Sequence, residues 1–171
     1  MKHRATPPEP SAPKKAGADA GLEPAFVQAL VDIFERRIVF NQLVGLKVTE
    51  VLPERVSGSL LMRPELVGHF AYNRVHGGVI SACLDAMGGL AVMAAIGSRH
   101  LDEPVEQRVQ RFARLGTIDL RVDYLRPGIG ESFVLKAEVL RLGSRVASTR
   151  MDFLHTDGTL LSSAAAAYIV S

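Results

Sequence analysis

Cysteine and tryptophan are the scarcest residues of this chain: its 171 residues include one cysteine, Cys83, and no tryptophan. A single cysteine cannot form a disulfide within the chain, so cross-links do not stabilise the fold. The histidines are scattered along the sequence: His3, His69, His76, His100 and His155. Because they have neither paired helical spacing nor cysteine partners, the sequence predicts no metal site.

The chain also has little net charge, +2 with histidine neutral, which does not favour nucleic-acid binding. Its basic start leads into proline-rich residues 6–13 instead of the apolar stretch of a signal peptide, so we expect a cytoplasmic protein. Residues 1–21 contain four prolines and few large apolar side chains. They predict a disordered tail before a single domain at residues 22–171.

One long hydrophobic run, residues 79–96, approaches the length that crosses a membrane. Asp85 lies inside it, and a central aspartate costs about 2.5–3.5 kcal/mol on insertion scales. Gly88 and Gly89 would each weaken an isolated helix by about 1 kcal/mol. We therefore predict no membrane span but a helix over residues 77–97 that is surrounded by protein.

Periodicity outside this run indicates the remaining elements. Apolar residues recur every three to four positions between residue 23 and Gly45 and predict an amphipathic helix. Apolar alternation and turn residues predict strands at 46–52, 56–62, 117–124, 133–139, 147–153 and 159–170. Residues 65–75 are irregular, and we expect the arginine-rich residues 100–115 to lie on the surface. Strands joined by tight turns pair antiparallel, so the predicted class is α+β, with the sheet wrapped around one apolar helix.

Two segments carry a family resemblance. Asn73-Arg-Val-His-Gly-Gly-Val-Ile-Ser-Ala-Cys-Leu-Asp85 and Thr117-Ile-Asp-Leu-Arg-Val-Asp-Tyr-Leu-Arg-Pro-Gly128 resemble the hotdog-fold acyl-CoA thioesterases, especially the phenylacetate-pathway type and its medium- and long-chain relatives. The similarity extends over residues 44–170. It implies a five- or six-stranded sheet around the helix, an acyl-CoA substrate, either fatty or aryl, and no cofactor. It also implies a homodimer or homotetramer, with active sites across the dimer interface.

The chemistry of these segments suits thioester hydrolysis, which needs a stabilised oxyanion and an activated nucleophile. The backbone N–H groups of Gly77 and Gly78, at the helix start, can bind the thioester oxygen. Asp85 can act as general base on a water or attack directly to form an anhydride, and the sequence leaves both routes open. By resemblance, Thr117 orients the water. We expect His76 to shape the loop before the helix instead of transferring protons.

The chain departs from the family pattern just before the His-Gly-Gly motif. Many members have Asn or Gln six or seven residues before this histidine, where His69 and Phe70 stand here. Either His69 or Asn73 would then polarise the thioester carbonyl. Arg126 and Arg145, near predicted strand ends, are candidates to bind CoA phosphates, although both also fit solvated turn arginines.

Two other functions stay open. Gly68-His69-Phe70 resembles a motif of hotdog hydroxyacyl-thioester dehydratases and hydratases, which would use His69 with Asp85. Ala71 replaces the proline that normally follows, and the spacing to Asp85 differs. A non-enzymatic acyl-CoA-binding protein is the third possibility, and the presence of Asp85 argues against it.

Overall fold

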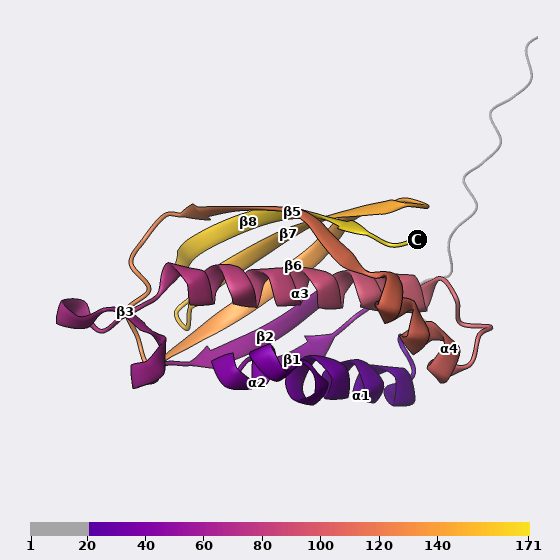
Figure 1. The fold of residues 1–171 in the computed structure, drawn as a ribbon, viewed down its shortest axis with the longest axis horizontal. Helices are drawn as coiled ribbons and strands as arrows, with labels where there is room; N and C mark the ends of the chain where they lie inside the picture. Colours follow the sequence, from indigo (N-terminus) through magenta and orange to yellow (C-terminus); the bar gives the residue numbers. More distant parts are fainter. Residues whose placement is uncertain (1–20) are drawn as a thin grey trace, which may run out of the picture.

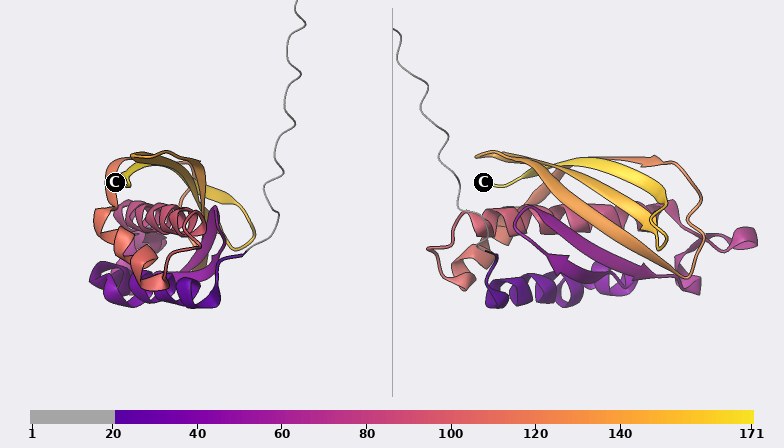
Figure 2. Two further views of the ribbon diagram at one scale, coloured as in Figure 1. Left: turned by 90° about the vertical axis from the view of Figure 1, so that its right-hand side faces the viewer. Right: turned by 180° about the vertical axis from the view of Figure 1, so that it is seen from behind.

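The computed structural model describes residues 21–171, and apart from Gly21 the predicted disordered tail lies outside this range. A six-stranded antiparallel sheet curves around one long helix, α3 (Gly77–Ser98) (Figure 1). Seen end-on in Figure 2, α3 lies inside the curl of the sheet, with the N-terminal helices on the open side. The predicted α+β class, an antiparallel sheet around a central helix, is confirmed.

The strands lie close to their predicted positions: β1 (Lys47–Val51), β2 (Arg55–Leu61), β5 (Gly116–Tyr124), β6 (Ser132–Leu142), β7 (Val146–His155) and β8 (Leu160–Ile169). Their order in the sheet is β1-β2-β6-β7-β8-β5, so β5 forms one free edge. The irregular residues before α3 form a two-stranded ladder of β3 (Val67–His69) and β4 (Arg74–Val75), which extends beyond the start of α3 (Figure 1). Two short 3₁₀ turns flank β3, at Pro64–Leu66 and Phe70–Tyr72.

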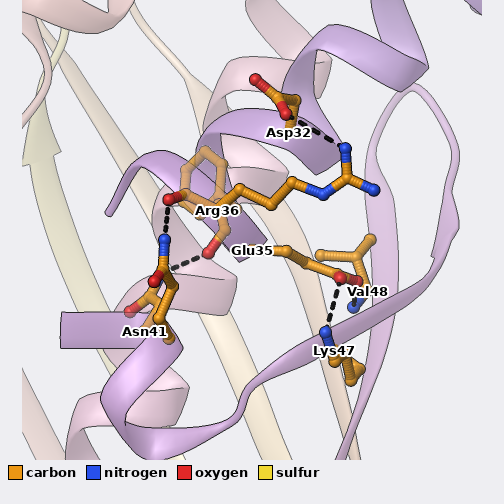
Figure 3. Close-up of polar contacts among 8 residues, drawn as sticks. Asp32, Glu35, Arg36, Asn41, Lys47 and Val48 are labelled. Carbon is orange, nitrogen blue, oxygen red and sulfur yellow. Dashed lines mark hydrogen bonds and ion pairs between the residues drawn. The ribbon is translucent and has the colours of Figure 1, made fainter. Parts of the chain in front are cut away.

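The N-terminal helix is interrupted, whereas its periodicity predicted one continuous element. It consists of α1 (Pro24–Asp32), a π-helical turn η1 (Ile33–Arg37) and α2 (Val39–Val44), with Ile38 extended between the last two. Side-chain contacts stabilise the interruption. Asn41 Nδ2 donates to the Phe34 carbonyl (2.9 Å), and the Glu35 carboxylate accepts from Val48 N–H (2.7 Å) and Lys47 Nζ (3.0 Å) (Figure 3). The Glu35 bonds fix η1 to β1, and the Asn41 bond joins α2 to η1.

Burial differs between the two halves of α3. From Met87 to Gly97 every residue is buried, which confirms the expectation of a wrapped helix for that half. By length and composition α3 could cross a membrane, yet 72% of its apolar window is buried within the fold. In the first half Gly78 is exposed and Ala82 and Asp85 are half-buried, so one face is open and the expectation is wrong there.

Residues 100–115 form α4 (Val105–Gln110) and a 3₁₀ turn, Arg111–Arg114. Arg108 is only 1% exposed, so the expectation of an entirely surface-exposed basic segment is wrong for this residue. Its guanidinium lies 4.6 Å from the centre of the Phe26 ring and pairs with Glu23. An arginine that stacks on an aromatic ring and pairs with a carboxylate can be buried, and here it joins α4 to α1.

Candidate active site

The Asp85 carboxylate is held by two hydroxyl groups from the edge of the sheet. Thr117 Oγ1 donates to Asp85 Oδ1 (2.9 Å), and Tyr168 OH lies 3.2 Å from the same oxygen and 2.9 Å from the Asp85 backbone carbonyl. Thr117 and Tyr168 are paired in the register of β5 and β8, which places their side chains next to each other. No side chain among residues 21–171 donates to Oδ2, so this oxygen is available for chemistry.

Tyr168 is the site residue that the sequence reasoning missed. Burial, and then the nearby Asp85 carboxylate, raise the pKa of Tyr168 far above its ordinary value, so the phenol stays a hydrogen-bond donor. A Cβ on Gly88 would collide with this hydroxyl, so the glycine makes room for the contact. The available signal was the alternation of β8, which puts one tyrosine on the same buried face as Ala164 and Ala166.

At the start of α3 only one of the two predicted oxyanion donors is free. His76 is the N-cap, and its Nδ1 accepts the N–H of Gly78 (2.8 Å). Among residues 21–171 the N–H of Gly77 has no partner, while Tyr124 OH donates to the Gly77 carbonyl (2.9 Å). The helix start therefore offers the N–H of Gly77 to an anion, with the positive end of the helix dipole behind it.

Two pockets open along this face of α3. One, of about 370 Å³, lies at the helix start between Gly77, Arg74 and Arg126. The other, of about 260 Å³, lies beside Asp85, Thr117 and Tyr168, and most of its remaining wall is apolar. A carboxylate with a free oxygen therefore borders an apolar pocket, and an anion-binding N–H borders a basic one.

The remaining predicted site residues are not all brought together within one chain. Arg126 lines the pocket at Gly77 and donates to the Leu160 carbonyl (2.9 Å). Arg145 lies in the β6–β7 turn near the other end of α3, where Arg99 Nη1 bonds the Leu142 carbonyl. With its 22 residues α3 is about 33 Å long, so Arg145 is far from the pocket at Gly77, and it does not line the pocket beside Asp85.

His69 and Asn73 also lie outside the Asp85 pocket. His69 packs against Phe70 and Tyr72, with ring centroids 5.8 and 4.9 Å away, and its Nδ1 is buried with no hydrogen-bond partner among residues 21–171. Asn73 is exposed in a left-handed conformation, with φ 45°. Within one chain, neither side chain is close enough to act with Asp85.

Two other kinds of chemistry find little support at this site. Burial raises the pKa of the Cys83 thiol to about 12, so it is not a thiolate nucleophile at neutral pH. In the part of the chain that the structure describes, no three His, Cys, Asp or Glu side chains are grouped closely enough to hold a metal ion. The chemistry available at the site is that of one carboxylate, two hydroxyl groups and a free backbone N–H.

An antiparallel sheet around a central helix, with an acid inside that helix, defines the class of this protein. Residues 72–162 match the Thioesterase superfamily, and the chain belongs to this family. The hotdog fold and the prediction of a thioesterase are thereby confirmed at the family level. The chain is 36% identical to the medium/long-chain acyl-CoA thioesterase YigI of Escherichia coli K12 over 139 residues, 81% of this chain and 90% of YigI.

Solved structures agree with this assignment. A Shewanella oneidensis protein related to the thioesterase superfamily is 35% identical and superposes with a TM-score of 0.80, covering 86% of this chain and 99% of that one. Thioesterase superfamily member 2 of Mus musculus is 19% identical, with a TM-score of 0.66 over 84% of this chain and 96% of its own. The second likeness concerns the fold alone.

Proposed function

We propose that this protein hydrolyses acyl-CoA thioesters to a free acid and CoA, with Asp85 as general base or nucleophile. The observation that carries the proposal is the Asp85 carboxylate itself, held through Oδ1 by Thr117 and Tyr168 and free at Oδ2 beside an apolar pocket. Membership of the thioesterase superfamily and the likeness to YigI support it. YigI acts on medium- and long-chain acyl-CoA, so we favour fatty over aryl substrates.

In the general-base route a water bound at Oδ2 attacks the thioester carbonyl carbon and gives its proton to Asp85. In the nucleophilic route Oδ2 attacks that carbon itself, and water then hydrolyses the resulting anhydride. Both routes put negative charge on the carbonyl oxygen, which the N–H of Gly77 stabilises. The tetrahedral intermediate then expels the CoA thiolate, which takes up a proton.

One chain alone cannot bring these two groups to the same carbonyl. Gly77 and Asp85 are eight residues apart on one helix, which corresponds to about 12 Å of rise, whereas reacting atoms must approach to about 3–3.5 Å. The free edge of β5 offers a solution through a second copy. Thr117 neighbours Asp85, and Tyr124 neighbours Gly77. Antiparallel pairing of two β5 strands with Thr117 opposite Tyr124 therefore places each Asp85 near Gly77 of the other copy.

The same arrangement determines how the substrate would be oriented in the site. The thioester would lie between Asp85 of one copy and Gly77 of the other, with the CoA portion toward the basic pocket of Arg74 and Arg126. Arginine suits phosphate groups, so we assign this contact to Arg126, which lines that pocket, in preference to Arg145, which does not. A dehydratase would need His69 next to Asp85, and only the second copy could supply it.

Release of CoA thiol from a panel of short, medium, long and aromatic acyl-CoAs tests the proposed function directly. Absence of hydrolysis with every member would reject it, and hydration of enoyl-CoA would then be measured for the alternative that uses His69.

The role of Gly77 can be tested with two substitutions. Gly77→Pro removes the N–H at the first helical position, where proline is favoured, and adds ring carbons beside Tyr124. The extended conformation of His76 (φ −66°, ψ 134°) also accepts a following proline. We expect kcat to fall by about 10²–10³-fold, as for other oxyanion donors. Gly77→Ala, which keeps the N–H, is the matched control and should retain most of the activity.

Mixing two inactive variants tests whether the site is shared between copies. A pair formed by an Asp85→Asn chain and a Gly77→Pro chain contains one intact site, with Asp85 from the second chain and Gly77 from the first. We expect co-refolded mixtures to regain activity that neither variant has alone. If the mixture stays inactive although mixed oligomers form, the site is not shared.

A further inference from the structure

The pocket beside Asp85 extends further than the catalytic step requires. It continues along α3 past the acid, over a floor of small residues on one helix face: Ala82, Ala86 and Gly89. Gly89 is one helical turn beyond Asp85, and its missing side chain deepens the pocket there. The far wall is apolar and aromatic, formed by Phe34, Phe112 and Leu115.

We propose that this pocket holds the acyl tail and that Gly89, Phe34 and Leu115 form its end and set the longest chain that fits. The inference rests on the proposed thioesterase function and adds residues that determine chain length. An aliphatic tail suits the apolar walls because burial of each methylene contributes about 0.8 kcal/mol. Asp85 lines the same pocket, so the reacting carbonyl would lie where the tail enters it.

The pocket volume indicates the length of that tail. A dry cavity of about 150 Å³ accommodates benzene, so a pocket of about 260 Å³ accommodates roughly ten carbon atoms. Medium-length chains would therefore fill the pocket, and longer ones would have to displace its end wall.

The end wall is held in place by polar contacts, one of them from Asn41, which also lines the pocket. Phe34 lies in the π-helical turn, and its carbonyl accepts from the buried Asn41 side chain at 2.9 Å. The next residue, Glu35, is bonded to β1 (Figure 3). The Phe34 ring also packs edge-on against Phe112, with 5.6 Å between the ring centroids. A fixed wall discriminates chain length because the protein does not rearrange to admit an extra methylene.

This wall comes partly from residues that precede the segment matched by the family model. The match to the Thioesterase superfamily covers residues 72–162, whereas Phe34 and Ile38 precede it. The acid and its hydroxyl partner Thr117 lie inside the matched segment. Chain-length selection would thus depend partly on the N-terminal helices.

Gly89→Ala tests the inference with a single methyl group. A Cβ at this position would lie 3.5 Å from Leu115 Cδ2 and 3.8 Å from Phe34 Cε1, ordinary van der Waals distances, so the fold accepts it. We expect the ratio of kcat/KM for decanoyl-CoA over hexanoyl-CoA to fall by about 10-fold or more, the effect of one methylene in a fitted pocket. Phe34→Ala should shift the preference toward longer chains.

Leu43→Ala is the control, because Leu43 belongs to the same N-terminal helices but is 68% exposed and outside the pocket. Thermal unfolding checks that each variant is folded. An unchanged chain-length profile in folded Gly89→Ala and Phe34→Ala, with an active wild type, would overturn the inference while leaving the proposed function intact.

If the wild type hydrolyses no acyl-CoA, the proposed function fails, and decanoate binding tests the pocket separately. NMR contacts between the decanoate chain and the Phe34 ring, weakened by Gly89→Ala, would support an acyl pocket. Decanoate that binds elsewhere, or equally well to both proteins, would overturn it.

Discussion

The two halves of α3 have the same apolar character in sequence but different environments. From Met87 to Gly97 the helix is enclosed by protein, with Gly97 against the Phe26 ring. From Gly77 to Ala86 one face is open and bears the acid, the free N–H and, apart from Gly89, the α3 residues that line the two pockets. The second half therefore anchors the fold, which allows the first half to leave polar groups available for chemistry.

Asp85→Asn should cause the largest loss of activity. It changes only the open half of α3. The amide keeps the shape of the side chain but cannot accept a proton from water or attack the thioester. We expect kcat to fall by at least about 10²-fold, the usual contribution of a general base. Thiol release measures the loss, and an unchanged melting temperature would show that the fold is intact. Activity close to wild type would remove Asp85 from the mechanism.

Leu90→Ala should act only in the enclosed half. Leu90 is completely buried, and truncation of such a side chain lowers the free energy of unfolding by about 2–5 kcal/mol. Urea denaturation measures this change. We expect kcat per folded molecule to stay within about 2-fold of the wild-type value, because Leu90 contributes to stability and not to the chemistry. A large loss of kcat in the folded variant would contradict that division.

Tyr168→Phe should have a smaller effect on the reaction and shows whether the phenol positions the acid. The variant loses one hydrogen bond to the carboxylate but keeps Thr117. We expect kcat to fall by about 10-fold, the equivalent of one such bond, with KM nearly unchanged. A purely structural role would lower stability and leave kcat per folded molecule unchanged.

The smallest predicted effect distinguishes the two arginines. Arg126→Ala should raise KM for acyl-CoA by roughly 3–10-fold through loss of a phosphate contact, since hydrogen bonds to charged groups contribute about 1.5–3 kcal/mol before screening by solvent. Arg145→Ala, at the far end of α3, should leave KM unchanged. Equal effects of the two substitutions would contradict the proposed direction of CoA.

The sequence predicted the parts of this fold that depend on periodicity. Strand alternation located the six long strands, and the run around Asp85 located α3. Periodicity could not indicate the π-helical turn, because that turn depends on tertiary contacts of Glu35 and Asn41. It also could not identify Arg108 as buried, since an arginine is buried only when its partners are in place.

The site was predictable where a local motif specified it. His76, Gly77 and Asp85 belong to one short segment, so their placement on α3 follows from one helix. Tyr168 reaches Asp85 only through the pairing of β8 with β5, a contact between residues 83 positions apart in the chain. The capture of the Gly78 N–H by His76 depends on a side-chain rotamer, which no sequence pattern encodes.

The free edge of β5 has a consequence for cells that carry a defective copy of the gene. If each site takes its acid from one chain and its N–H donor from another, every wild-type chain supplies one working Asp85 whichever partner it meets. Loss of Asp85 from half of the chains would then halve the number of sites and no more. A chain that lacked both Asp85 and the N–H of Gly77 would also inactivate the sites of its wild-type partners, and such an allele would be dominant.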